Sequence, residues 1–218
     1  MPVFGNHKSP SVRVATVGLN PSATEFLDDK GDWKPETKRL PLVTDFGVRE
    51  RGDLNAEHIE QANKLRAEYF QRPHHSFFGP LQGLLSAVNI EWNYVAGTAV
   101  HVDLVACGTW RAWSEMSGKA IQAVVANCHN HLIQTLTELP DGTFLLLDGR
   151  TVNTTLAANS FDRVEDTIGE VEVVTVWRGS LQIEGKCFKY AGWSKPVDKV
   201  ANCLYLKNWL QGVIASCG

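Results

Sequence analysis

The chain has 218 residues, of which 44% are hydrophobic and 21% charged, and its formal net charge is −3. This length suits one α/β domain over residues 1–218, and the composition excludes a disordered or fibrous protein. The negative charge excludes a protein that is basic on all sides, but not a local basic face. No apolar run approaches the roughly 20 residues that span a bilayer, and the first residues lack the apolar core of a signal peptide, so we expect a cytoplasmic protein without a membrane partner.

The hydrophobic pattern predicts strands that alternate with helices. Apolar runs bounded by turn residues indicate buried strands, and apolar residues at helical spacing indicate helices. In chain order the pattern predicts a strand over residues 12–18, an irregular stretch over 28–52, a helix over 55–71, a helix over 77–88 with Gly79-Pro80 in its first turn, a strand over 99–106, a helix over 119–139, a strand over 143–149, a short helix over 150–158, strands over 171–176 and 182–190 that flank Arg178-Gly179-Ser180, and a helix over 197–214. Asn55 is expected to cap the first helix, with Ile59 and Leu65 on its apolar face. This alternation is typical of a three-layer α/β/α sandwich around a central, mainly parallel sheet.

The most informative segment is Gly18-Leu19-Asn20-Pro21-Ser22, which follows the first predicted strand. In open α/β sheets, ligands bind outside the carboxyl ends of the strands. Glycine lets the backbone come close to a ligand, proline stiffens the turn, and Asn20 offers both a donor and an acceptor that can hold a water molecule. The alternative is an Asx-type turn that only ends the strand.

Neither a metal nor an organic cofactor is expected. The five cysteines form no C-x-x-C pair, which argues against a zinc or iron–sulfur site. His129 and His131 have a spacing that does not place both rings on one helix face. His101 lies on the same side of its predicted strand as Asp103, where it could orient that carboxylate or touch a ligand, although a core histidine is the commoner case.

With these features in order, the chain resembles the uracil-DNA glycosylase superfamily from about Val12 to Val213. Gly18–Ser22 is similar to the superfamily's first motif in its asparagine version, as in the mismatch-specific and single-strand-selective branches. The resemblance implies that Asn20 positions the hydrolytic water. It also implies that the neighbouring residues line the base pocket, namely Gly18, Leu19, Pro21 and Ser22.

The family also places a base-reading residue, often Asn, on a central strand, and Val102-Asp103-Leu104-Val105 is the most similar stretch here. An ionised carboxylate at Asp103 only accepts hydrogen bonds, so it should repel O4 of uracil and prefer the exocyclic amine of a cytosine-like base. The alternative is a buried carboxylate that caps a loop or pairs with His101. We expect Asn20 and Asp103 to converge on one cleft wide enough for a nucleobase.

Two further roles follow from the resemblance. One aromatic residue is expected to stack on the base, although each candidate is individually more typical of core packing; the candidates are Phe26, which is preferred, Trp33 and Phe46. Gly192-Trp193-Ser194-Lys195-Pro196-Val197 occupies the place of the second motif, but the family's histidine is absent.

In this second motif, Lys195 is expected to bind phosphate, and Trp193 or Val197 to fill the gap left by the extruded nucleotide. Ser194, Pro196 and, farther away, Arg111 are also expected to contact DNA. The alternatives are that Pro196 only begins the last helix and that Arg111 is a solvated loop residue.

The sequence therefore predicts a monomeric DNA glycosylase that acts in base-excision repair on single- or double-stranded DNA. It would hydrolyse the bond between the sugar and an extruded, aberrant or modified base, such as a uracil-like base or a modified cytosine. The alternative is a non-catalytic nucleic-acid- or nucleotide-binding member of the same fold. The fingerprints of nucleophilic hydrolases, P-loop enzymes and dinucleotide-binding enzymes are absent from the sequence.

Overall fold

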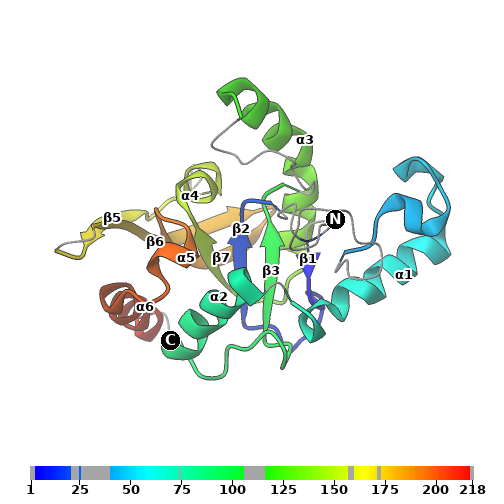
Figure 1. Cartoon of the computed structure of the whole chain (residues 1–218). Helices are drawn as coiled ribbons and strands as arrows, with labels where there is room; N and C mark the ends of the chain where they lie inside the picture. Colours follow the sequence, from blue (N-terminus) through cyan, green and yellow to red (C-terminus); the bar gives the residue numbers. More distant parts are fainter. Residues whose placement is uncertain are drawn as a thin grey trace.

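A mixed sheet forms the centre of the fold (Figure 1). The structure is a computed structural model that describes residues 3–20, 25, 40–73, 75–105, 116–156, 160–170 and 173–216. Seven strands in these ranges form one sheet in the order β1-β3-β2-β4-β7-β6-β5. Their bounds are β1 Val3–Phe4, β2 Val14–Gly18, β3 Ala99–Asp103, β4 Phe144–Asp148, β5 Val164–Ile168, β6 Val174–Ile183 and β7 Lys186–Trp193.

Parallel strands make up the middle of the sheet. β3, β2, β4 and β7 run parallel to one another, whereas β1 is antiparallel to β3, β6 to β7, and β5 to β6. Every residue of β2, β3 and β4 is buried, which is typical of parallel strands covered on both faces. β5 lies at the sheet edge and is largely exposed.

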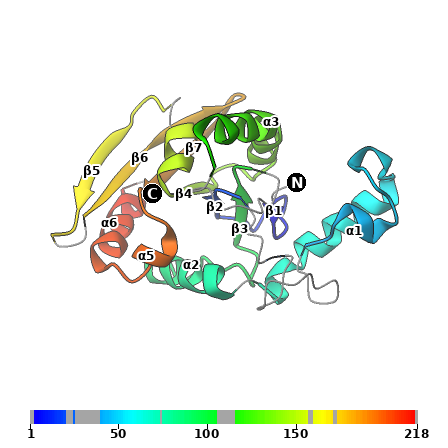
Figure 2. The ribbon, with the colours of Figure 1, turned by 45° about the horizontal axis from the view of Figure 1, so that its top comes forward.

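Helices cover both faces of the sheet (Figure 2). α2, α5 and α6 pack in one hydrophobic cluster with one face, and α3 and α4 pack in a second cluster with the other. The helices are α1 Ala56–Ala67, α2 His75–Val88, α3 Gly118–Thr137, α4 Arg150–Leu156, α5 Val197–Val200 and α6 Leu204–Ala215, with short 3-10 turns η2 Val43–Phe46, η3 Arg51–Asp53 and η4 Tyr69–Gln71. The predicted fold class, an α/β sandwich around a mostly parallel sheet, is confirmed. None of the helices in the described ranges is long and apolar enough to cross a membrane.

The two predicted strands around residues 178–180 are wrong in their boundaries. β6 continues through Arg178-Gly179-Ser180, and the hairpin to β7 turns at Glu184 and Gly185. Both turn residues have positive φ, at 47° and 83°, which matches the right-handed twist of a two-residue hairpin. The short strand β1 and the edge strand β5 were not predicted, because neither has an apolar run of its own.

The predicted helices also differ from the structure in detail. The first helix ends at Ala67, and in α1, all of whose residues are described, none is buried, so Ile59 and Leu65 form no core face. The prediction of Pro80 in the first turn of α2 is wrong, because this helix begins at His75. The final predicted helix is divided into α5 and α6. The capping role of Asn55 is confirmed, since its side chain accepts a hydrogen bond from the backbone N–H of His58.

Candidate functional site

A cavity of about 690 Å³ opens at the carboxyl edge of the four parallel strands. Its volume lies within the range of roughly 300–1,000 Å³ that is usual for small-molecule sites. After β2 the chain forms β3 on one side and β4 on the other, and ligands of open α/β sheets bind at such a switch point. The cavity is lined by Phe4, Leu19, Asn20, Glu25, Ser76, Phe77, Phe78, His101, Asp103, Asp148, Gly149, Arg150, Thr151, Val152, Ser194, Pro196 and Asp198. The prediction that Asn20 and Asp103 share one cleft is confirmed.

The backbone holds the loops after β2 and β3 together. Gly18 is in register with Asp103 in the parallel pair. Beyond the strands, the N–H of Leu104 donates to the carbonyl of Gly18, and the N–H of Val105 donates to the carbonyl of Leu19, both at 2.9 Å. Asn20 follows this last bond immediately, so the sheet itself brings its position close to that of Asp103.

Gly18 is required by the side chains packed against it. A Cβ at this position would lie 2.7 Å from the ring of His101 and 3.1 Å from Oδ1 of Asp103. Neither group can move easily, because both side chains are buried. The glycine of the Gly18–Ser22 motif therefore allows the His101–Asp103 pair to lie across the end of β2.

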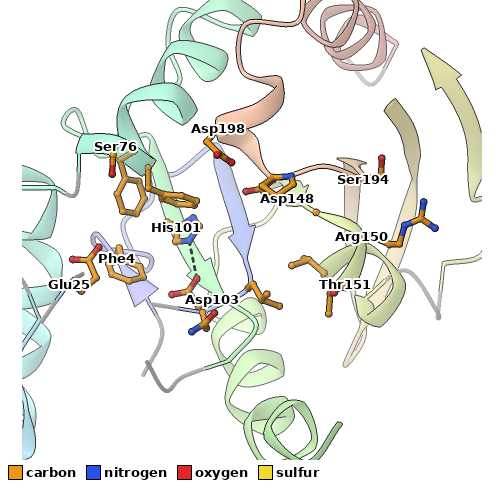
Figure 3. A pocket seen from close by; sticks show the side chains of 17 residues that line it. Phe4, Glu25, Ser76, His101, Asp103, Asp148, Arg150, Thr151, Ser194 and Asp198 are labelled. Carbon is orange, nitrogen blue, oxygen red and sulfur yellow. Dashed lines mark hydrogen bonds and ion pairs between the residues drawn. The ribbon is translucent and has the colours of Figure 1, made fainter. Parts of the chain in front are cut away.

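His101 and Asp103 form a buried pair on the cavity wall (Figure 3). Nε2 of His101 lies 3.1 Å from Oδ1 of Asp103, and both residues are only 2% exposed. Burial raises the pKa of Asp103, while the charge and the hydrogen bond of His101 act in the opposite direction. Oδ2 of Asp103 has no hydrogen-bond partner among the described residues. The prediction that His101 lies on the same side of its strand as Asp103 is confirmed, and the two side chains are in contact.

Asp148 is a second buried carboxyl group of the cavity and was not predicted. It is the last residue of β4, and its Oδ1 accepts a 2.8 Å hydrogen bond from Nε1 of Trp193. Burial raises its pKa to about 7, the hydrogen bonds from Trp193 and from the backbone of Val197 lower it, and the charge of Asp198 raises it again. A carboxyl group with this pKa can accept or donate a proton near neutral pH. The sequence feature that could have identified Asp148 is an apolar run that ends in Asp148-Gly149.

We predict that Asp148 makes the stability of the protein depend on pH. Its pKa rises from 3.8 in the unfolded chain to about 7 in the fold. Its contribution is therefore fully present below about pH 4 and is lost as the pH rises through 7, by up to about 4 kcal/mol in unfolding free energy. In Asp148→Asn, melting temperatures measured between pH 5 and 8 should vary less than in the wild type, whereas the exposed-site variant Asp166→Asn should leave the profile unchanged. An Asp148→Asn profile as steep as that of the wild type would contradict this prediction.

Asn153 of α4 ties the carboxyl ends of β4 and β7 together. Its buried Nδ2 donates to the carbonyls of Leu147, Gly149 and Trp193, at 3.0, 2.8 and 3.2 Å. Gly192 lies directly beneath this amide, and a Cβ at Gly192 would overlap the side chain of Asn153. The amide therefore fixes the relative position of the two strand ends that carry Asp148 and Ser194.

Gly192→Ala should consequently destabilise the protein by roughly 1–3 kcal/mol, the usual cost of overpacking a core. Gly83→Ala in α2 is the matched control, because its Cβ would meet nothing within 4 Å and alanine favours a helix. Urea denaturation of both variants measures the difference. Equal stability of Gly192→Ala and the wild type would show that the Asn153 amide can move away.

The residues of the predicted second motif differ in their positions relative to the cavity. Ser194 and Pro196 line the cavity, and Pro196 also precedes α5 as its N-cap residue, so the alternative of a helix start holds for it. Trp193 and Val197 are 0% exposed. The prediction that they contact DNA is wrong for the folded structure, because both side chains pack in the core. Lys195 is half-buried and does not line the cavity.

Of the three aromatic residues predicted to stack on the base, the structure describes Phe46 alone. Phe46 packs against His58, with ring centroids 5.5 Å apart, and lies outside the cavity, so its prediction as a base platform is wrong. Phe77 of α2 is half-buried, lines the cavity and contacts the ring of His101 edge to face. The predicted residues Pro21, Ser22, Phe26, Trp33 and Arg111 lie outside the described residues.

Besides Asp103 and Asp148, the exposed Asp198 and the buried Glu25 are carboxylates that line the cavity. Glu25 is 5% exposed, and its Oε1 accepts a 2.7 Å hydrogen bond from the hydroxyl of Tyr69. Within the described ranges, no three His, Cys, Asp or Glu side chains come together as metal ligands. Comparisons with protein-family models, curated proteins and solved structures found no match to the chain.

Proposed function

We propose that the protein is a DNA glycosylase that hydrolyses the bond between deoxyribose and a flipped, aberrant or modified base. The observation that carries the proposal is the shared cavity, in which the amide of Asn20 and the carboxyl of Asp103 line one space at the strand ends. Flipping is needed because the glycosidic bond is not accessible inside a stacked duplex, and poorly paired bases cost least to extrude.

In the proposed arrangement, Asp103 reads the edge of the base and Phe77 packs against its ring. Oδ2 of Asp103 is a buried acceptor with no partner among the described residues. A hydrogen bond donated by the base to Oδ2 compensates the cost of burying this acceptor. Phe77 offers an aromatic surface on the same cavity wall. Asn20 takes the role of orienting water through its amide oxygen.

The reaction joins the oxygen of water to C1′ of the sugar as the bond between C1′ and the base nitrogen breaks. The electron pair of the broken bond leaves with the base, which then takes up a proton. The water loses a proton, and Asp148 is the buried group on the cavity wall whose pKa, about 7, suits it to accept one. The carboxylates of the cavity also favour the positive charge that develops on the sugar in the transition state.

An oligonucleotide panel tests the proposal. Each labelled oligonucleotide carries one base from a set of uracil, hypoxanthine and modified cytosines, in single- and double-stranded form. We expect alkali-labile abasic sites at one or more of these bases. Binding to the oligonucleotides without any abasic product would instead favour a non-catalytic nucleic-acid-binding protein, and absence of both binding and product would contradict both functions.

A further inference from the structure

A buried chain of hydrogen bonds leads through the sheet to Asp103. The hydroxyl of Tyr94 lies 2.5 Å from Oγ1 of Thr16, which lies 2.8 Å from Nδ1 of His101. Nε2 of His101 in turn lies 3.1 Å from Oδ1 of Asp103. All four residues are at most 4% exposed, so water does not compete for these bonds. The segments involved are the turn before β3, the centre of β2 and the end of β3.

The donors in this chain can be assigned from Tyr94 onward. Burial raises the pKa of Tyr94 well above its ordinary value, so its hydroxyl keeps its hydrogen. Its acceptor is Oγ1 of Thr16, because a buried donor without an acceptor would be costly. Thr16 then donates either to Nδ1 of His101 or, at 3.3 Å, to the carbonyl of Val100.

Both choices engage the same oxygen of Asp103. If Thr16 donates to His101, the Nε2–H of His101 donates to Oδ1. If Thr16 donates to the carbonyl of Val100, the Nδ1–H of His101 donates to Oγ1 of Thr16. Oδ1 of Asp103 is then still engaged, because it shares a hydrogen with Nε2 of His101. A hydrogen on Oδ2 would be a buried donor with no acceptor among the described residues. Oδ2 is therefore left as an acceptor.

We propose that Thr16 and Tyr94 are positioning residues which, through His101, hold Oδ2 of Asp103 as an acceptor and thereby select a base that carries an amino group. This inference rests on the proposed function. An amino group of the cytosine or adenine type offers N–H donors to Oδ2. The N3–H of uracil is flanked by two carbonyl oxygens, which a carboxylate oxygen would repel.

The test compares bases that differ only in an amino or an oxo group. The pairs are 5-methylcytosine with thymine and 5-hydroxymethylcytosine with 5-hydroxymethyluracil, each at one position of the same single-stranded oligonucleotide. Thr16→Val and Tyr94→Phe remove one hydroxyl each. Their matched controls are Thr143→Val and Tyr190→Phe, which remove buried hydroxyls bonded to Pro140 and Ser160 away from the cavity.

We expect the wild type to prefer the amino member of each pair, and we expect this ratio of rates to fall roughly 3- to 10-fold in Thr16→Val and Tyr94→Phe. The ¹⁵N resonance of His101 Nδ1 should move in the same two variants. Both measurements should remain unchanged in Thr143→Val and Tyr190→Phe.

Three results would overturn the inference. The first is a wild-type preference for oxo bases, and the second is a Thr16→Val variant in which the His101 resonance moves but the ratio of release rates does not change. The third is an equal loss of preference in Thr143→Val and Tyr190→Phe. If the wild type releases no base at all, the proposed function fails. The ratio of the Kd values for the two oligonucleotides of each pair then still tests whether Asp103 selects amino bases.

Discussion

Asn20→Ala is expected to lower the rate of base release at least 100-fold while leaving DNA binding intact. The amide is the group proposed to orient the attacking water, and losing one oriented polar group at a reacting centre costs about 2.7–4 kcal/mol in comparable sites. Asn20 is half-buried and lies beyond the buried residues of β2, so its truncation should have little effect on core packing. Single-turnover rates and equilibrium binding, measured on the same oligonucleotide, separate the two effects.

The control for this variant is Asn208→Ala, which removes an exposed amide of α6 away from the cavity. It should retain the full rate. If Asn20→Ala released base as fast as the wild type, Asn20 would not orient the water, and the Gly18–Ser22 segment would be a turn that only ends β2.

Asp103→Asn is expected to change which base is released. An amide offers an N–H donor as well as a carbonyl acceptor, so it can satisfy both O4 and N3–H of uracil. The preference for amino bases over oxo bases should fall by at least about 10-fold, since one hydrogen bond to a charged group contributes about 1.5–3 kcal/mol. Release rates for 5-methylcytosine and thymine, which carries the same O4 and N3–H as uracil, at the same position measure this ratio.

Asp166→Asn on the exposed strand β5 is the matched control and should keep the wild-type ratio. Thermal unfolding of Asp103→Asn should be recorded as well, because the variant also alters a buried hydrogen bond to His101. A folded Asp103→Asn protein with an unchanged base profile would show that Asp103 is structural and does not contact the base.

The parts of the site that lie on the parallel strands could be predicted from the sequence. An apolar run followed by Gly18-Leu19-Asn20 marks the end of a buried strand, and the run that contains Asp103 marks another. Carboxyl ends of parallel strands meet at one edge of a sheet, so these residues were expected to converge. The same reasoning applied to Asp148, at the end of the third apolar run, would have placed it in the cavity too.

The second motif was harder to predict because its side chains depend on tertiary partners. A tryptophan in a Gly-Trp-Ser-Lys loop is compatible with exposure or burial. Trp193 is buried because its N–H has a partner in Asp148, which comes from a distant strand. Phe77 lines the cavity because the first turn of α2 lies next to the cavity. The start of a helix is hard to predict from sequence, since helix boundaries depend on packing as much as on local pattern.

Mass spectrometry of an intact oligonucleotide after incubation with the protein tests base hydrolysis most directly. For a substrate base, we predict that the strand loses the mass of the free base and gains the mass of one water molecule, with the released base detected in equal amount. A strand that stays bound to the protein but keeps its mass, at every base of the panel, would contradict the proposed activity.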